Sequence, residues 1–298
     1  MDSSSSKEEG YTNILGHKLF YKIFNPRGSQ ARRGTVLCLH GGPGMTHDYI
    51  LPLSDLSNFG YRVAFYDQLG CGKSELPKNL ALFTVERAVE EVEASRKRLK
   101  LGGKIHLMGS SWGGLLAIAY ALKYQKNLNG LILAGAYPNV PFATREMERL
   151  KSELPQSVKK VMRKYENEGD YENSEYQKAI MVFYRRHLCR LPEWPGEVKH
   201  SLDHLSKPVY YTMNGPNEFT IIGNTRYWDV SDQLSEISVP TLVTGGRYDE
   251  MTPNVARAIH RGIKGSKLVI FEKSSHLPFW EEREKYIRVV AEFLEKSH

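Results

Sequence analysis

A short apolar run followed at once by a serine framed by glycines constrains the fold more than any other feature of this sequence. Residues 104–108, Lys-Ile-His-Leu-Met, are typical of a buried strand, and residues 115–124, rich in Ala and Leu, are typical of a helix. The segment between them, residues 109–113, is Gly-Ser-Ser-Trp-Gly. So short a connection brings two backbones close together, which favours residues without a side chain. The pattern predicts a strand, a tight turn and a helix, with Ser111 in the turn.

Several other short apolar runs resemble residues 104–108. Each is aliphatic or β-branched and is bounded by Gly, Asp or Ser, as strands buried on both faces of a parallel sheet are. The segments between them have helical spacing, and Thr84 is placed as the N-cap of one such helix. This alternation predicts an α/β fold with a mainly parallel sheet, opened by a β-hairpin over residues 11–24. The apolar runs are residues 35–40, 62–67, 104–109, 131–134, 241–244 and 267–271, and later helices are expected over residues 254–263 and 281–296.

One long region departs from this alternation. Residues 138–229 are charged and aromatic, have helical periodicity and contain no clear buried strand. They predict a helical cap inserted into an α/β core that comprises residues 11–137 and 230–298. Residues 1–10 are polar and serine-rich and lack the apolar stretch of a signal peptide, so they predict a disordered tail.

Composition argues against several classes of protein. The formal net charge is +7, but the basic residues are interspersed with acids, which argues against a nucleic-acid or membrane partner. Three cysteines, Cys38, Cys71 and Cys189, do not make a disulfide framework, and no zinc-binding spacing occurs. No apolar run reaches the 18 residues of a membrane span. We therefore expect a cytoplasmic protein that needs no metal and no organic cofactor.

The segment 109–113 also matches G-x-S-x-G, in which a serine on a sharp turn between strand and helix exposes its hydroxyl as a nucleophile. The helix beginning there offers free N–H groups and a partial positive charge, which place the N–H of Trp112 to bind an oxyanion. A second donor is expected in residues 40–44, His-Gly-Gly-Pro-Gly, and we assign it to the N–H of Gly42. These features indicate the α/β-hydrolase fold with Ser111 as the nucleophile.

A serine nucleophile needs a base and an acid, and in this fold the chain order is Ser, acid, His. Among the later histidines only His276 lies in a loop beyond a core strand, because the others fall in the cap or inside a helix. Asp249 also lies just past a strand, whereas Asp229 and Asp232 lie at the cap exit with no strand before them. The sequence therefore predicts a catalytic triad of Ser111, Asp249 and His276.

Two further features of the sequence suggest functions that their context argues against. Residues 67–74, Asp-Gln-Leu-Gly-Cys-Gly-Lys-Ser, end like a P-loop but carry Asp67 where that loop needs glycine, so they do not predict ATP binding. The segment is interpreted as a turn near the site, and if Cys71 lines the site, bulky thiol reagents should slow the enzyme. His40 precedes the nucleophile in the chain and is interpreted as a structural histidine.

Together these motifs resemble the prolyl iminopeptidase family of α/β-hydrolase aminopeptidases. The cap segment 213–220, Met-Asn-Gly-Pro-Asn-Glu-Phe-Thr, is most similar to the archaeal aminopeptidase that works with the tricorn protease. Ser110 departs from the pattern, because many bacterial members carry Gly there. The matching segments are residues 40–44, 67–74, 109–114, 246–249 and 275–276.

The resemblance implies the removal of N-terminal residues from short peptides and a functional link to an upstream protease. It also implies that Glu218 from the cap and Glu250 beside Asp249 bind the α-ammonium group of the substrate, because buried carboxylates give strong charge-assisted hydrogen bonds. We therefore expect a monomeric serine aminopeptidase that forms an acyl-enzyme on Ser111.

Two alternatives stay open at this point. The same triad serves amidases, esterases and lactonases that act on small molecules, and the fold also occurs in homologues that only bind a ligand. A dehalogenase or a typical epoxide hydrolase is disfavoured, because both need Asp at the position of Ser111. The sequence also does not separate cap aromatics that line a pocket from those that form the cap's own core. These aromatics are Phe142, Phe183, Tyr184, Trp194, Tyr210 and Trp228.

Overall fold

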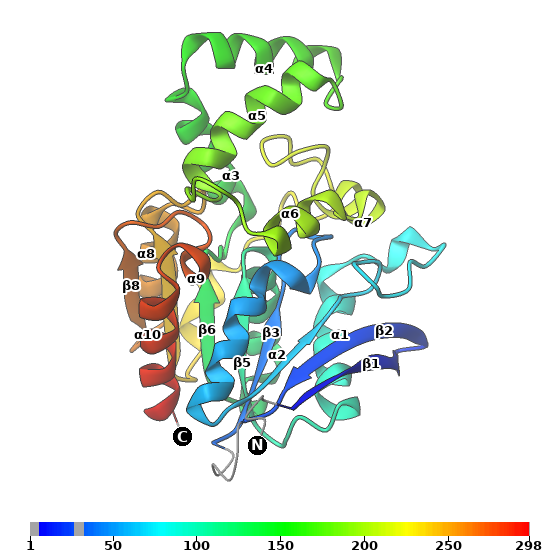
Figure 1. The fold of residues 1–298 in the computed structure, drawn as a ribbon, viewed down its shortest axis with the longest axis vertical. Coiled ribbons are helices and arrows are strands. Elements are labelled where there is room, and N and C mark those ends of the chain that lie inside the picture. Colours follow the sequence, from blue (N-terminus) through cyan, green and yellow to red (C-terminus); the bar gives the residue numbers. More distant parts are fainter. Residues whose placement is uncertain (1–5, 27–32, 298) are drawn as a thin grey trace.

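A computed structural model describes residues 6–26 and 33–297, and its centre is one eight-stranded sheet (Figure 1). The strand order is β1-β2-β4-β3-β5-β6-β7-β8. The pairs β1·β2 and β2·β4 are antiparallel and the remaining pairs are parallel, which confirms the predicted fold class. The strands are β1 (Lys7–Ile14), β2 (His17–Phe24), β3 (Thr35–Leu39), β4 (Arg62–Tyr66), β5 (Ile105–Ser110), β6 (Leu128–Ala134), β7 (Thr241–Gly246) and β8 (Lys267–Phe271).

The predicted tail over residues 1–10 is wrong at its C-terminal end. Strand β1 begins at Lys7 and pairs in register with β2, so that Lys7 lies opposite Phe24. Residues 1–5 lie outside the described residues. The polar composition that suggested a tail is compatible with an edge strand whose residues are mostly exposed, and its charged residues disfavour pairing with another chain.

The central strands are buried on both faces, because helices pack on each side of the sheet. Along β3, for example, Leu37 and Leu39 pack with α1 and α2, whereas Val36 and Cys38 pack with the 3-10 helix η1 and with α10. Thr84 caps α1 as predicted, since its hydroxyl accepts a hydrogen bond from the N–H of Arg87 at 3.2 Å. The helices of the core are η1 (His47–Phe59), η2 (Leu80–Leu82), α1 (Val85–Arg98), α2 (Trp112–Tyr124), η3 (Gln125–Asn127), η4 (Ser231–Glu236), α8 (Pro253–Gly262), α9 (Pro278–Glu281) and α10 (Arg283–Glu295).

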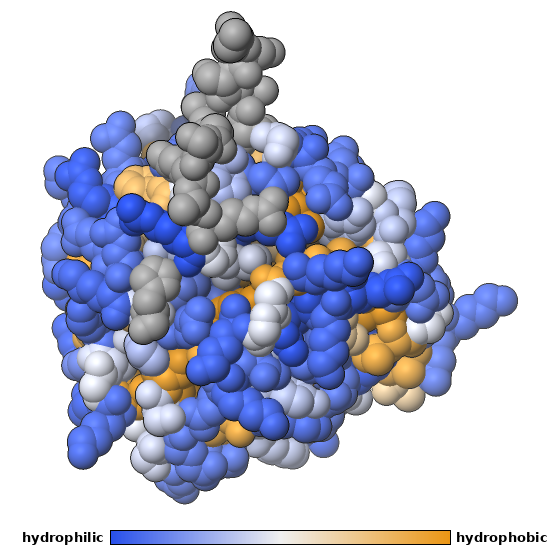
Figure 2. All heavy atoms as spheres, turned by 90° about the horizontal axis from the view of Figure 1, so that it is seen from below, coloured by the Kyte–Doolittle hydropathy of each residue, from blue (hydrophilic) through white to orange (hydrophobic). Residues whose placement is uncertain are grey.

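Between β6 and β7 the chain leaves the core and forms five helices above the carboxyl ends of the parallel strands (Figure 1). The excursion starts and ends at one point, where Asn139 and Asp229 form an isolated β-bridge. These helices are α3 (Val140–Ser152), α4 (Gln156–Glu168), α5 (Ser174–His187), α6 (Gly196–Asp203) and α7 (Lys207–Met213). The face of the molecule opposite them is mostly hydrophilic, with apolar side chains visible between charged ones (Figure 2). No helix in the described ranges combines the length and apolar composition needed to cross a bilayer.

The turn between β5 and α2 is as tight as the glycines suggested. Ser111 has φ 57° and ψ −122°, a backbone conformation that side chains rarely adopt. A Cβ on Gly109 would lie 2.0 Å from the carbonyl oxygen of Gly113, and a Cβ on Gly113 would lie 2.3 Å from the carbonyl oxygen of Leu39. Both glycines are therefore required for strand β5, helix α2 and strand β3 to approach one another this closely.

Replacing Gly109 by Ala should therefore destabilise the fold, whereas the same change at Gly103 should not. A Cβ on Gly103 would meet no heavy atom within 4 Å. We expect Gly109→Ala to lower the free energy of unfolding by about 1–3 kcal/mol or more, as overpacked sites do, and Gly103→Ala to change it by less than about 0.5 kcal/mol. Urea unfolding of both variants measures this, and equal unfolding midpoints would contradict the packing argument.

Candidate active site

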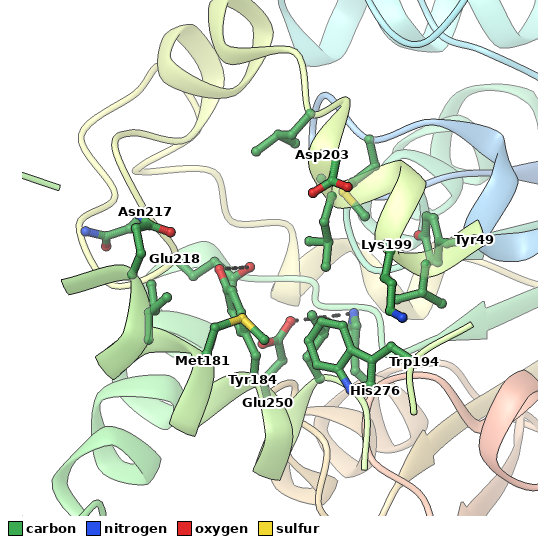
Figure 3. Close-up of a pocket in the computed structure, with 18 of the residues that line it drawn as sticks. Tyr49, Met181, Tyr184, Trp194, Lys199, Asp203, Asn217, Glu218, Glu250 and His276 are labelled. Carbon is green, nitrogen blue, oxygen red and sulfur yellow. Dashed lines mark hydrogen bonds and ion pairs between the residues drawn. The ribbon is translucent and has the colours of Figure 1, made fainter. Parts of the chain in front are cut away.

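Ser111 opens into a cavity of about 840 Å³ between the core and helices α5 to α7. The cavity is lined by residues far apart in the chain, among them Gly42, Ser111, Glu218, Glu250 and His276. In Figure 3 the side chains of Glu218, Glu250 and His276 point into this space. The carboxyl ends of β3, β5 and β7 bring Gly42, Ser111 and Glu250 to one edge of the sheet, where open α/β sheets bind ligands.

His276 and Asp249 form a buried hydrogen-bonded pair. The Nδ1 of His276 lies 2.6 Å from Oδ1 of Asp249, and both side chains are at most 3% exposed. Asp249 is held in turn by the backbone N–H groups of Met251, at 2.8 Å, and Gly246, at 3.4 Å. Because Nδ1–H donates to the carboxylate, Nε2 is the nitrogen left to face the cavity. Asp229, by contrast, lies at the β-bridge where the cap joins the core.

The imidazole of His276 lies beside the strand end that holds Ser111. The backbone N–H of Ser111 donates to the carbonyl oxygen of Ala134 at 2.9 Å, and a Cβ on the next residue, Gly135, would lie 2.6 Å from Cε1 of His276. Gly135 has φ +52° and leaves room for the ring. The hydroxyl of Ser111 has no hydrogen-bond partner in the described part of the protein.

Opposing effects act on the protonation of His276. Burial lowers its pKa, but the Asp249 carboxylate raises it through charge and through its hydrogen bond, and Glu218 and Glu281 add to the increase. The net result is a pKa above the ordinary histidine value. The imidazole is therefore a stronger base than a free histidine.

The glycine-rich loop after β3 carries Gly42 into the cavity wall and is held by His40. The Nδ1–H of His40 donates to the carbonyl of Gly41 at 3.0 Å, and its Nε2 accepts the N–H of Gln68 at 3.0 Å. Burial lowers the pKa of His40 to about 4, so the ring stays neutral and both bonds persist. His40 is thus placed as a structural histidine, in keeping with the sequence interpretation.

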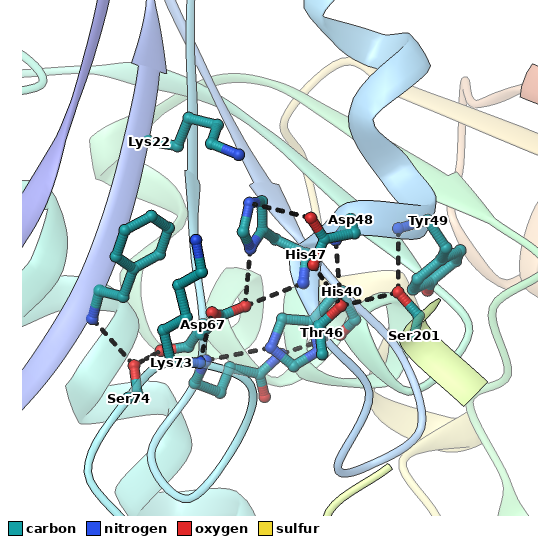
Figure 4. A network of polar contacts seen from close by, with 12 residues as sticks. Lys22, His40, Thr46, His47, Asp48, Tyr49, Asp67, Lys73, Ser74 and Ser201 are labelled. Carbon is teal, nitrogen blue, oxygen red and sulfur yellow. Dashed lines mark hydrogen bonds and ion pairs between the residues drawn. The ribbon is translucent and has the colours of Figure 1, made fainter. Parts of the chain in front are cut away.

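Residues 67–74 also hold the glycine-rich loop after β3 in place. The sequence did not reveal this supporting role. Gln68 links it to helix α2, because its amide nitrogen donates to the carbonyl of His40 at 2.8 Å and its oxygen accepts the indole N–H of Trp112 at 2.9 Å. Asp67 accepts from the N–H and Nδ1 of His47 and from the N–H of Lys73 (Figure 4). These contacts fix Gly42 and Trp112, the two residues predicted to supply oxyanion donors, relative to each other.

Cys71 does not line the cavity that contains Ser111. Its side chain is 1% exposed and borders a separate void of about 20 Å³ between Pro43, Trp112 and Val209. Burial raises the pKa of its thiol well above the ordinary range, with the charges of Asp67 and Glu91 adding to the shift. The expectation of thiol-reagent sensitivity was conditional on Cys71 lining the site, and the structure does not meet that condition.

Glu218 and Glu250 are brought together although 31 residues separate them in the sequence. Glu250 is buried and Glu218 is half-buried, and desolvation raises the pKa of each carboxyl group. The charge of Glu218 raises the pKa of Glu250 further, well above its ordinary range. One oxygen of Glu218 accepts from the Tyr184 hydroxyl at 3.3 Å, and one oxygen of Glu250 lies 3.7 Å from Nε2 of His276. The two carboxyl groups also hydrogen-bond to each other, with a protonated Glu250 donating to an ionised Glu218. Among the described residues, no other group donates to the second oxygen of either carboxyl.

The structure also separates the cap aromatics that the sequence left undivided. Tyr184, Trp194 and Tyr210 line the cavity, whereas Phe183 is fully buried and packs on Phe219 at a ring distance of 4.8 Å. Phe142 and Trp228 pack partly buried against the core. Four further tyrosines line this cavity or the small pocket beside it, and no periodicity identified them: Tyr49, Tyr137, Tyr176 and Tyr211. Within the described ranges, no three His, Cys, Asp or Glu side chains come together in a way that could hold a metal ion.

Comparison with known proteins identifies the family. Residues 34–283 match the family described as alpha/beta hydrolase fold. Proline iminopeptidase of Saccharolobus solfataricus is 50% identical over 296 residues, covering 99% of this chain and 94% of that protein. Proline iminopeptidase of Thermoplasma volcanium is 48% identical over the full length of both.

Solved structures agree with this assignment. VinJ superposes with a TM-score of 0.93 at 35% identity, covering 98% of this chain and 99% of that one. Proline iminopeptidase of Mycobacterium smegmatis superposes with a TM-score of 0.90 at 30% identity, covering 97% and 98%. With matches that extend over nearly its whole length, the chain belongs to the prolyl iminopeptidase family of α/β hydrolases.

Proposed function

We propose that this protein is a serine aminopeptidase that releases N-terminal residues from short peptides through an acyl-enzyme on Ser111. The observation that carries the proposal is the pair Glu218 and Glu250, two neighbouring carboxyl groups in the same cavity as Ser111 and His276 that no Lys or Arg side chain of the described residues neutralises. Two neighbouring carboxyl groups gain strong charge-assisted hydrogen bonds when a cationic group arrives, so the pair suits an ammonium supplied by the substrate. The name shared by the relatives makes N-terminal proline the first residue to test.

In this mechanism each residue has one task. The hydroxyl of Ser111 attacks the scissile carbonyl while Nε2 of His276 takes its proton, and Asp249 holds the imidazole and stabilises its cation. The N–H groups of Gly42 and Trp112 bind the oxyanion of the tetrahedral intermediate, a contribution whose loss typically costs about 10²–10³ in rate. His276 then protonates the leaving amine, and water hydrolyses the acyl-enzyme with the same base.

The carboxyl pair would make the enzyme an exopeptidase. An α-ammonium group held between Glu218 and Glu250 places the first peptide carbonyl at Ser111, because all three groups border one cavity. A peptide blocked at its N-terminus would leave the carboxyls without a cationic partner, which is costly. We further propose that residues 138–229 act as a cap, since this region supplies Glu218 and Tyr184 to the site.

We also propose that the protein takes products of an upstream protease, and that it does so in the cytoplasm as a monomer. A cavity of about 840 Å³ has room for a short peptide but not for a folded chain. The three cysteines are all buried free thiols, a state that a reducing compartment maintains.

Replacing Ser111 by Ala should abolish covalent labelling and turnover. A fluorophosphonate probe should label the wild-type protein at Ser111, and the variant should lose both the label and about 10³–10⁶ of kcat, as other serine hydrolases do. Ser110→Ala is the matched control, because Ser110 is adjacent but lies outside the cavity lining. A folded wild-type protein that the probe does not label would favour the ligand-binding alternative.

Replacing Glu218 or Glu250 by Gln should raise KM for peptides with a free N-terminus by about 10–100-fold, the value of one or two charge-assisted hydrogen bonds. Uncharged esters and N-blocked amides should be affected much less, because they lack the cation. Glu193→Gln is the matched control, since Glu193 lines the same cavity but is exposed. Equal effects on free and blocked substrates would reject the ammonium role and favour the small-molecule hydrolase.

The pH dependence of kcat/KM and KM should distinguish the titration of His276 from that of Glu218 and Glu250. For an uncharged ester, kcat/KM should fall as pH decreases through the pKa of His276, which lies above the ordinary value of about 6.5 because the carboxylates outweigh burial. For a free peptide, KM should rise as well at low pH, because protonation of Glu218 and Glu250 removes the charge that binds the ammonium. An acid limb at or below 6.5 for the ester would contradict this assignment.

A further inference from the structure

The C-terminal end of α5 is hydrogen-bonded to both loops that carry His276 and Asp249. The carbonyl oxygen of His187 accepts the backbone N–H of His276 and the backbone N–H of Glu250, each at 3.2 Å. A single cap carbonyl thus joins the loop after β7 to the loop after β8. No other cap residue in the described ranges has a backbone oxygen that accepts from both of these loops.

The side chain of His187 adds a third bond to the same place. Its Nδ1 lies 2.8 Å from the carbonyl oxygen of Tyr248, the residue immediately before Asp249. A carbonyl only accepts, so Nδ1 carries the proton. The ring also packs on Phe183, one turn earlier in α5, with ring centroids 4.8 Å apart. The ring is therefore fixed from both sides, by the cap core and by the acid loop.

A second contact nearby ties the same cap segment to the base loop. The backbone N–H of Arg190 donates to Glu281 at 2.7 Å, and Glu281 also accepts the N–H and the hydroxyl of Ser275 at 2.7 and 2.8 Å. Ser275 directly precedes His276. The guanidinium of Arg190 lies over the ring of Tyr248 at 3.9 Å. The segment from His187 to Arg190 thus contacts Tyr248 directly and is linked to Ser275 through Glu281.

We infer that His187 is a positioning residue for the His276–Asp249 pair. The end of the cap that carries His187 therefore stays bound to the loops of His276 and Asp249 and does not lift in each turnover. Lifting it would break the hydrogen bonds that hold the N–H groups of His276 and Glu250 and the carbonyl of Tyr248. Displacements of about 1 Å at reacting groups can cost about 10²-fold in rate, so these bonds have catalytic consequences. This inference rests on the proposed roles of His276 and Asp249.

Substitutions that keep or remove the donor at the Nδ1 position test the inference. Asn places an amide N–H₂ near that position, whereas Leu has no donor and Gln carries its amide one carbon farther out. We expect His187→Leu to lower kcat for an uncharged ester about 10–100-fold with KM changed less than about threefold. His187→Asn should stay within about fivefold of wild type. If the Leu variant does not fold, His187→Gln provides the same comparison with Asn.

His204→Leu is the matched control. The Nδ1 of His204 also bonds a backbone carbonyl at 2.8 Å, but that carbonyl belongs to His200 in its own helix, and His204 does not line the cavity. This variant should leave the ester kcat within about twofold of wild type. A comparable loss in His204→Leu would show that any cap histidine has this effect and would overturn the positioning role.

A spectroscopic measurement separates positioning from general stability and does not need turnover. The proton between Nδ1 of His276 and Asp249 should give a low-field proton NMR signal, because that bond is short and charge-assisted. We expect this signal to shift or broaden in His187→Leu but not in His187→Asn or His204→Leu. An unchanged signal together with an ester kcat within threefold of wild type in a folded His187→Leu would overturn the inference. Failure of the proposed function would instead appear as a wild-type protein that neither turns over nor reacts with the fluorophosphonate.

Discussion

The backbone of Ser111 has φ 57° and ψ −122°, and the packing of neighbouring segments holds it in this conformation. The position of the Ser111 hydroxyl in the cavity depends on this backbone conformation. Such a conformation typically costs on the order of 1–3 kcal/mol and persists only where the surroundings leave no alternative. Here Gly109 and Gly113 let β5, α2 and β3 close around the turn, and the N–H of Ser111 is fixed to Ala134 on the neighbouring strand. Gly135, directly after that strand, is the residue against which the imidazole of His276 packs. One tight turn therefore sets the position of the Ser111 hydroxyl and, through the neighbouring strand, that of the His276 imidazole proposed as its base.

Asp249 and Glu250 are adjacent in the chain but have opposite environments, and the difference is consistent with the different tasks proposed for them. Asp249 receives backbone N–H groups and the imidazole N–H, which stabilise its charge although it is buried. Glu250 faces another buried carboxyl, and burial and repulsion disfavour its ionised form. A group of the first kind, held by several hydrogen-bond donors, can orient a base. A group of the second kind gains most when a cation arrives, which is the property that an ammonium site needs.

Local patterns predicted the strand-turn-helix around Ser111 and the mainly parallel sheet, because short-range rules govern glycine-framed turns and apolar strands. The start of β1 was missed because an exposed edge strand needs no apolar face, so Lys7, Glu8 and Glu9 resemble a tail. The pairing of Glu218 with Glu250 came only from resemblance, since nothing in the spacing of two distant acids predicts their contact. The bond from the His187 carbonyl was inaccessible to sequence, because every residue has a carbonyl and only tertiary packing decides its partner.

Contacts between the cap and the core lie on both sides of the cavity. On the side of the glycine-rich loop, Ser201 of α6 contacts the hydroxyl of Thr46 at 2.7 Å and accepts the N–H of Tyr49 at 3.1 Å (Figure 4). On the opposite side, His187 bonds the loops of His276 and Asp249. Between these two anchors the cavity reaches solvent past exposed charged side chains such as Glu193, Lys199 and Asp203. In the proposed function a peptide would reach Ser111 along this charged rim while both anchors stay in place, so residues 138–229 would not have to lift for substrate to enter.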